Sequence, residues 1–123
     1  MLPAAGQGAL GLEIRQTDAP LSAAVQALAH TPTWLACAAE RAVSRALGGS
    51  CSMPLAAYAT VADAGSDGRH RLHLRTLLGH PEQAGLLRAE QVADVHSLAD
   101  AEAVGLAAAQ ALRAQAPAGW LPN

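Results

Sequence analysis

The amino-acid sequence predicts an α+β fold, in which a three-stranded antiparallel sheet is covered on one face by about three helices. The first observation behind this prediction is a change in the spacing of the apolar residues. Before residue 50 they recur at intervals of three and four, as in helices, and after Pro54 they alternate, as in half-buried strands. The second is that short polar connections separate the alternating segments, which favours an antiparallel meander. An extended segment over residues 1–16 precedes these elements.

The segment of residues 1–16 has the pattern of a strand without a partner. Pro3 and several glycines interrupt it, and Leu10, Leu12 and Ile14 then alternate with small or polar residues. Such alternation indicates a half-buried strand. No hairpin partner follows closely in the sequence, so we interpret this segment as a strand of a sheet that lies outside the chain.

Two helices are predicted to follow this segment. Asp18 can cap a helix over residues 19–30, and Thr31 with the proline after it begins a second helix. The pair Gly48-Gly49 ends the second helix, because glycine adopts the left-handed C-terminal cap without strain. The face of the second helix opposite its apolar stripe is predicted to be solvated, and it carries Glu40, Arg41, Ser44 and Arg45.

Three strands are predicted from the alternation that follows. They cover Leu55–Ala62, Arg71–Leu78 and Leu86–Val92, and a turn of sequence DAGSDG joins the first two. The outward face of this sheet carries mostly charged residues, which are Arg71, His73, Arg75, Arg88 and Glu90. We expect this face to meet solvent or a partner. Its arginines could bind anionic groups, although a solvated face is the simpler interpretation.

A last helix is predicted after Ser97. Ser97 and Asp100, three residues later, resemble a capping box with Asp in place of Glu. The helix is expected to run to about Gln115, because Pro117 and Gly119 then end it. The predicted order of elements is therefore a strand fragment, two helices, three strands and a final helix.

The composition excludes several classes of function. The formal net charge is −2, and no basic stripe with interleaved aromatic residues is visible, so a nucleic-acid partner is not predicted. No apolar run approaches the roughly 20 residues that span a membrane, and the N-terminus lacks the basic start and apolar core of a signal peptide. We therefore expect a cytoplasmic protein without a membrane partner, in which both cysteines are reduced.

A metal site is not predicted either. Only His70 and His73 are close in the sequence among the five histidines, and an offset of three in a strand places them on opposite faces. Cys37 lies in the second predicted helix near its apolar edge, and we interpret it as a packing residue.

Cys51 is the leading candidate for chemistry. It stands in the stretch ALGGSCSMP, directly after the predicted second helix and its glycine pair. A nucleophilic cysteine usually needs a nearby cation or a helix N-terminus, and neither is visible, while a helix C-terminus opposes the thiolate. This pattern argues against a hydrolase or a redox catalyst. It permits the stable thioether attachment of a group that is itself electrophilic, and a small apolar loop residue is an equally simple alternative.

Three stretches of the sequence together resemble one known family. They are LPAAGQGALGLEIR, HTPTWLACAAERAVSRALGGSCSMPLAAYA and LHLRTLLGHP, in this order. They resemble the C-terminal part of porphobilinogen deaminase, also called hydroxymethylbilane synthase, a transferase of tetrapyrrole (porphyrin and heme) biosynthesis. The resemblance covers essentially the whole chain. It implies that residues 17–123 form the family's C-terminal cofactor-attachment domain and that residues 1–16 are an interdomain strand belonging to the missing domains.

The resemblance also implies a site. In this family the cysteine of the GGSC loop carries a dipyrromethane cofactor through a thioether, and the matching residue is Cys51. Gly49 and Ser50 belong to the same loop, and Gln7 matches a glutamine near the family's active cleft. The family enzyme adds four porphobilinogen units in turn to the cofactor, each with loss of ammonia, and hydrolysis releases the product. After the cysteine the family usually has Gln and Val, where this chain has Ser52 and Met53.

The resemblance places the catalytic residues elsewhere. The family's catalytic aspartate and its substrate-binding arginines belong to the first two domains, so no catalytic residue is expected in this chain and the isolated chain is expected to be inactive. Its implied partners are the missing N-terminal domains and porphobilinogen. The alternative is a stand-alone α+β module for interaction or dimerisation. A thiol redox protein is disfavoured, because Cys37 and Cys51 lie on separate elements without C-x-x-C spacing.

Overall fold

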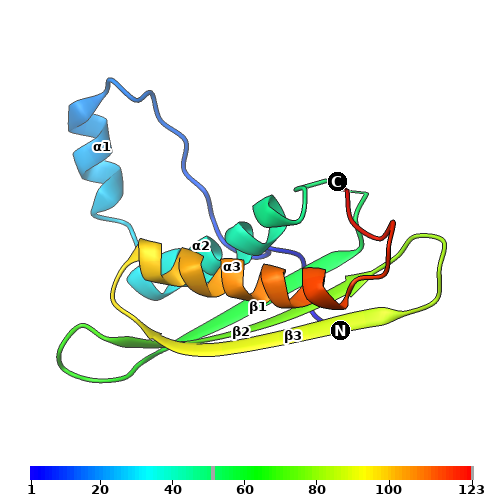
Figure 1. Cartoon of the computed structure of the whole chain (residues 1–123). Coiled ribbons are helices and arrows are strands. Elements are labelled where there is room, and N and C mark those ends of the chain that lie inside the picture. The colour runs from blue at the N-terminus through cyan, green and yellow to red at the C-terminus, as the bar shows by residue number, and fades with distance from the viewer. Residues whose placement is uncertain (51, 123) are drawn as a thin grey trace.

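The structure is a computed structural model that describes residues 1–50 and 52–122. Six elements follow one another along the described chain: α1 (Ala19–Gln26), α2 (Thr31–Ala46), β1 (Leu55–Asp63), β2 (His70–Gly79), β3 (Leu86–Val95) and α3 (Leu98–Gln115). Figure 1 shows α2 and α3 as one layer above a single sheet. This arrangement confirms the predicted α+β fold with its three-stranded antiparallel sheet.

The sheet has the strand order β1-β2-β3, and both strand pairs are antiparallel. Ala59 of β1 lies opposite Leu74 of β2, and Leu74 lies opposite Gln91 of β3. Odd-numbered residues of β1 and β3 therefore line up with even-numbered residues of β2, and these rows are the inward, more buried ones. β3 extends beyond its predicted end at Val92, because its alternation continues as far as the buried Val95.

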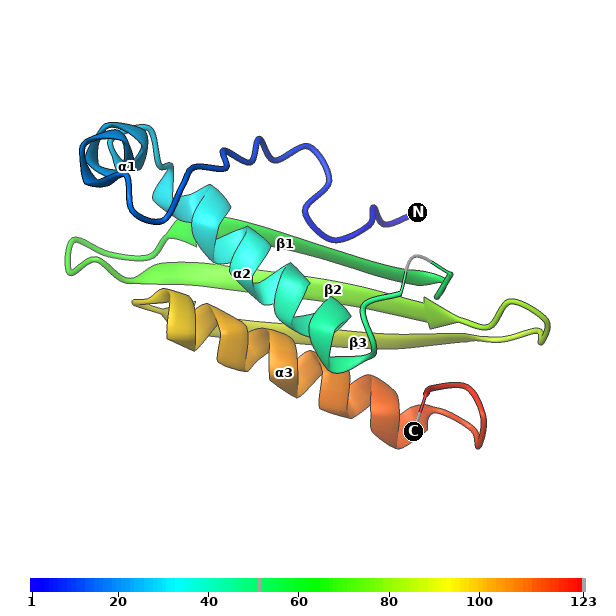
Figure 2. The same ribbon diagram turned by 90° about the horizontal axis from the view of Figure 1, so that it is seen from above.

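Two helices cover the inward face of the sheet (Figure 2). The core between the two layers consists of small and medium-sized apolar residues, among them Leu35, Val43, Leu47, Leu72, Leu74, Leu78, Val95, Ala108 and Leu112. The structure has three helices, as predicted, but only α2 and α3 cover the sheet, because α1 has no buried residue and packs on no other element of the described chain. α1 also ends at Gln26, before the predicted residue 30.

The end of α2 is a Schellman motif built on the predicted glycine pair. Gly48 and Gly49 have φ values of +111° and +59°, in the region that favours glycine. The Gly49 N–H donates to the Ser44 carbonyl at 2.7 Å, and the Gly48 N–H donates to the Arg45 carbonyl at 3.3 Å. These two hydrogen bonds are the 6→1 and 5→2 bonds of the motif. The chain therefore leaves α2 in a fixed direction just before Cys51.

The predicted cap of α3 is confirmed. The Ser97 hydroxyl accepts a hydrogen bond from the Asp100 N–H at 3.1 Å, and the Asp100 carboxylate accepts one from the His96 N–H at 2.9 Å. The hydrogen bond from His96 is the main reason why the pKa of Asp100 lies below its usual value. This pair of hydrogen bonds differs from a standard capping box, because the Asp100 carboxylate accepts from the N–H of His96, the residue before the N-cap, rather than from the N–H of the N-cap Ser97.

Replacing Ser97 by alanine is expected to lower the free energy of unfolding by about 1 kcal/mol, the usual value of an N-cap hydroxyl. Urea unfolding followed by circular dichroism measures the change. Ser22→Ala is the matched control, because Ser22 is exposed on the unpacked helix α1. Equal stability of the two variants would show that the Ser97 hydroxyl does not stabilise α3.

The segment of residues 9–15 pairs with none of the three strands in the described chain. Leu10 and Leu12, which were predicted to alternate in a half-buried strand, are 89% and 54% exposed. The assignment of this segment to a sheet outside the chain stays a prediction.

Glu40 lies elsewhere than predicted. It was placed on the solvated face of α2, but it is only 6% exposed. Its carboxylate accepts hydrogen bonds from the Gly6 N–H and from the Ala59 N–H of β1, both at 2.7 Å. The Ala57 N–H donates in turn to the Pro3 carbonyl at 3.1 Å. Glu40 is buried because the free edge of β1 and the first residues of the chain both present N–H groups to it.

Candidate functional site

The loop between α2 and β1 contains Gly49, Ser50 and Cys51, three of the four residues singled out by sequence. Cys51 lies outside the described residues, so the loop is described by its neighbours. Gly49 and Ser50, directly before it, are exposed, and so is Ser52, directly after it. A side chain at this point of the sequence is therefore flanked by solvent-accessible residues on both sides.

Hydrogen bonds hold the described part of this loop on both sides of position 51. The Ser50 hydroxyl accepts from the Ser52 N–H at 3.1 Å, and the two serine hydroxyl oxygens are 2.5 Å apart. The Ser50 carbonyl accepts from the Met53 N–H at 3.2 Å. The Pro54 carbonyl accepts from the Gly79 N–H at 2.9 Å, which joins the end of the loop to the end of β2.

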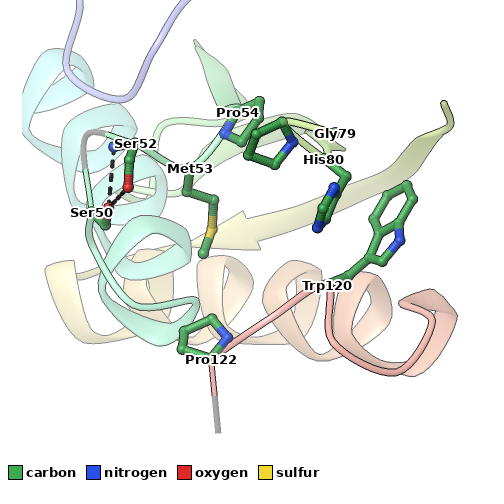
Figure 3. Close-up of a pocket in the computed structure, with 9 residues that line it drawn as sticks. Ser50, Ser52, Met53, Pro54, Gly79, His80, Trp120 and Pro122 are labelled. Carbon is green, nitrogen blue, oxygen red and sulfur yellow. Dashed lines mark hydrogen bonds between the residues drawn. The ribbon is translucent and has the colours of Figure 1, made fainter. Parts of the chain in front are cut away.

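A cavity of about 290 Å³ lies beside the loop (Figure 3). Three segments line it: the loop itself, the end of β2, and the chain after α3. The loop contributes Ser50 and Ser52, the end of β2 contributes His80, and the chain after α3 contributes Trp120 and Pro122. Prolines and a methionine complete the wall, so the cavity is mainly apolar with a few polar groups.

His80 and Trp120 form the aromatic side of the cavity. Their ring centroids are 5.4 Å apart. The Trp120 indole N–H donates to the Gln83 side-chain oxygen at 2.8 Å. The His80 Nδ1 accepts the N–H groups of Glu82 and Gln83, both at 3.1 Å, which places the proton of the neutral ring on Nε2. The Nε2–H is then the remaining donor of this ring.

The charges at this site are few. His80 carries the only ionisable side chain among the described residues that line the cavity. An acid–base pair for proton transfer therefore does not occur within the described lining. The site offers apolar surface, two serine hydroxyls and one imidazole, which suits the holding of a group better than the transfer of protons.

The structure does not bring Gln7 to this cavity. Gln7 is exposed in a turn of the N-terminal segment, where its N–H donates to the Ala4 carbonyl at 3.2 Å. The N–H of its neighbour Gly6 donates to the carboxylate of Glu40, in the middle of α2. Gly49 forms part of the C-terminal cap of α2 and does not line the cavity either. A ligand contact of Gln7 stays a prediction.

Cys37 has the character of a packing residue. It lies half-buried on α2, and burial, followed by the nearby charge of Glu40, raises the pKa of its thiol. A raised pKa leaves less thiolate for reaction at neutral pH. In the described part of the chain no three His, Cys, Asp or Glu residues are placed to hold a metal ion, and no helix is both long and apolar enough to cross a membrane.

The charged groups on the outward face of the sheet are largely paired. Arg71 donates to Asp94 at 2.8 Å across the β2–β3 pair, and this hydrogen bond lowers the pKa of the Asp94 carboxyl. His73 contacts Glu90. The guanidinium of Arg75 lies 5.5 Å from the ring centroid of Tyr58. These contacts favour the interpretation of this face as a solvated one, as the sequence indicated.

Comparison with known proteins identifies the family. Residues 34–114 match the family model described as porphobilinogen deaminase, C-terminal domain. The chain belongs to the porphobilinogen deaminase family. The matched range runs from the first turn of α2, through the loop with Cys51 and the whole sheet, to the last turn of α3. It therefore covers the packed domain and the loop with Cys51, but not Trp120 and Pro122 of the cavity lining.

Curated porphobilinogen deaminases align with almost all of this chain. The protein of Albidiferax ferrireducens is 50% identical over 115 residues, which are 93% of this chain and 35% of that protein. Those of Paraburkholderia phytofirmans and Ralstonia nicotianae are 49% and 50% identical, over 93% and 89% of this chain and 32% and 31% of their own lengths. The chain thus spans about a third of these porphobilinogen deaminases.

Sequence reasoning missed the aromatic side of the site. His80 stood only within the LHLRTLLGHP stretch of the family resemblance, and Trp120 was not singled out. One signal was present, because the chain has only two tryptophans and no phenylalanine. A large aromatic residue in a chain built from small apolar ones usually fills a particular space.

Proposed function

We propose that this chain is the cofactor-attachment part of a hydroxymethylbilane synthase, in which Cys51 carries a dipyrromethane group through a thioether. The whole enzyme would join four porphobilinogen units with loss of ammonia. The observation that carries the proposal is the GGSC loop, which follows α2 inside the range that matches the porphobilinogen deaminase family.

The residues around position 51 fit a bulky attached group. Ser50 and Ser52 are exposed, and a largely apolar cavity of about 290 Å³ opens beside them. When bound, the dipyrromethane group supplies the pyrrole chain end to which substrate units are added. A group attached at position 51 would meet free space rather than packed side chains, and the two serine hydroxyls are close by as hydrogen-bond partners.

The attachment requires only one reactive group from this chain, the Cys51 thiol. The Cys51 sulfur would form one C–S bond to the electrophilic methylene carbon of a pyrrole unit while the C–N bond of that carbon breaks, and the thiol proton would leave with the ammonia. A reactive electrophile does not need a strongly activated thiol, which agrees with a loop placed after the C-terminal end of a helix. The serine hydroxyls and the His80 Nε2–H would orient the attached group by hydrogen bonds.

The isolated chain is expected to show no consumption of porphobilinogen. The physical reason is that the described residues near Cys51 include no acid–base pair to move the protons of the reaction. The measurement follows porphobilinogen concentration over time with the purified chain. Turnover by the chain alone would contradict this part of the proposal.

A fusion protein that restores the missing part of the enzyme is the positive control for this activity test. The N-terminal two thirds of the porphobilinogen deaminase of Albidiferax ferrireducens, which this chain does not span, are joined to this chain at the matching position. The fusion is expected to consume porphobilinogen, and its Cys51→Ser variant is expected to lose at least a hundredfold in rate. Cys37→Ser is the matched control and is expected to keep the activity, because Cys37 lies half-buried within α2 and is not part of the GGSC loop.

A further inference from the structure

The outward face of the sheet holds a second cavity, which shares no described lining residue with the cavity beside the loop between α2 and β1. Its volume is about 480 Å³. Residues of β2 and β3 line it, and the first two residues of the chain, Met1 and Leu2, form a further wall. Leu2 and Leu77 are both half-buried and give the cavity apolar surface. The cavity is therefore a groove that combines apolar and charged side chains.

Two arginines line this groove from neighbouring strands, Arg75 on β2 and Arg88 on β3. In the register of the sheet Arg75 lies opposite Glu90, and Leu77 lies opposite Arg88. Arg75 and Arg88 are thus diagonal neighbours on one face, an arrangement in which the two residues lie about 7 Å apart. Both are exposed, so a dissolved molecule can reach their guanidinium groups.

In the described part of the chain, neither Arg75 nor Arg88 forms an ion pair. Glu90 carries the carboxylate of the described lining and lies opposite Arg75, but it contacts His73 instead. Two positive charges on neighbouring residues repel each other. A bound anion would relieve this repulsion, so the groove is suited to a negatively charged ligand.

Tyr58 of β1 limits the movement of Arg75. The Arg75 guanidinium lies 5.5 Å from the centroid of the Tyr58 ring, within the range of a cation–π contact. A guanidinium has five N–H donors, and a contact with an aromatic ring leaves donors for the oxygens of a ligand. Because Arg75 already has this contact, it loses less conformational freedom when a ligand binds.

We propose that this groove is a binding site for a small dicarboxylate. One carboxylate binds the Arg75 guanidinium and the other binds the Arg88 guanidinium, since the planar fork of a guanidinium matches the two oxygens of a carboxylate. The carbon chain between the carboxylates lies against Leu77. Two guanidinium groups on separate strands favour a ligand with two separated charges over one compact anion. The proposal goes beyond the proposed function and does not rest on it, because neither arginine lines the other cavity.

An NMR titration of the isotope-labelled chain with glutarate, at constant ionic strength, tests the proposal. The amide signals of residues 75–77 and 88–90 are expected to shift, with a dissociation constant in the millimolar range, because both ion pairs are exposed to solvent. Acetate, which has a single carboxylate, is expected to bind roughly tenfold more weakly, because it contacts only one arginine.

Three arginine variants locate the site. Arg75→Gln and Arg88→Gln are each expected to raise the dissociation constant of glutarate roughly tenfold, since each removes one charge-assisted contact. Arg71→Gln is the matched control, because Arg71 is exposed on the same face of β2 and its replacement changes the net charge equally. Arg71 pairs with Asp94 outside the groove, so this variant should change the constant by less than about twofold.

Glu90→Gln is expected to act in the opposite direction. Glu90 lines the groove, so its carboxylate repels a bound dicarboxylate. Replacement by a neutral residue of the same size should lower the dissociation constant of glutarate by roughly twofold to threefold, the effect of one exposed charge. Tighter binding in this variant, with weaker binding in Arg75→Gln and Arg88→Gln, is the pattern that the groove predicts.

Four results would overturn the proposal. The first is that glutarate shifts none of the named signals. The second is an equal effect of Arg71→Gln, Arg75→Gln and Arg88→Gln, which would show a response to net charge alone. The third is that inorganic phosphate binds as tightly as glutarate with the same dependence on both arginines, which would show a site for one compact anion. The fourth is that a tetraglutamate peptide binds much more tightly than glutarate, which would assign the groove to an acidic protein segment.

Discussion

Replacing Glu40 by alanine is expected to lower the free energy of unfolding by about 3 kcal/mol, because two N–H groups lose their acceptor in a mostly buried place. These groups belong to Gly6 and Ala59, and both donate to the Glu40 carboxylate at 2.7 Å. Urea unfolding followed by circular dichroism measures the loss. Hydrogen exchange of the Gly6 and Ala57 amides should accelerate as well, since the N-terminal segment loses its attachment to β1.

Glu102→Ala is the control for this variant. Glu102 pairs with Arg45 at 3.1 Å, but its side chain is 48% exposed, so its removal should cost less than about 0.5 kcal/mol. Glu40→Gln is expected to be nearly as unstable as Glu40→Ala, because the amide nitrogen would face an N–H donor. A cost of Glu40→Ala no greater than that of Glu102→Ala would contradict the assignment of Glu40 as a buried acceptor.

Gly105→Ala is expected to destabilise the domain by about 3 kcal/mol, at the upper end of the usual cost of overpacking. A Cβ on Gly105 of α3 would stand 2.2 Å from the Ala39 carbonyl oxygen and 2.7 Å from the Ala42 Cβ, both on α2. The two helices would have to separate over the core. Thermal unfolding followed by circular dichroism measures the effect.

Whether Gly105→Ala lowers or raises the free energy of unfolding distinguishes a packed helix position from an exposed one. In an exposed helix position the same change would stabilise the chain by about 1 kcal/mol, since alanine is the better helix former. Gly11→Ala is the matched control, because a Cβ at Gly11 meets no atom within 4 Å and its effect should be small. A stabilised Gly105→Ala variant would show that α2 and α3 are not in close contact there.

The elements were predictable from sequence because local signals agree with the global fold. The glycine pair at Gly48 ends α2 by backbone conformation alone, and Ser97 caps α3 with its own side chain. α1 was predicted as a covering helix because Leu21, Val25 and Leu28 recur at helical spacing and form an apolar stripe. Whether an apolar stripe packs against another element depends on the tertiary structure. In the described chain α1 packs on no other element.

Glu40 and Trp120 were not predictable from local patterns. Helical periodicity placed Glu40 among solvated residues, but the residues that bind it, Gly6 and Ala59, are far away in the sequence. The neighbours of Trp120 lie on a hairpin more than thirty positions earlier, so no local pattern points to them. Cys51, in contrast, is predicted from the GGSC stretch alone and not from contacts, and its role stays a prediction.

The mass of the peptide that contains Cys51, taken from the fusion described above after reaction with porphobilinogen, tests the central claim most directly. We predict an added two-pyrrole group on this peptide and an unmodified Cys37 peptide. The Cys51→Ser variant should carry no such group and should not consume porphobilinogen. An active fusion with an unmodified Cys51 peptide, or with the group on another residue, would contradict the account.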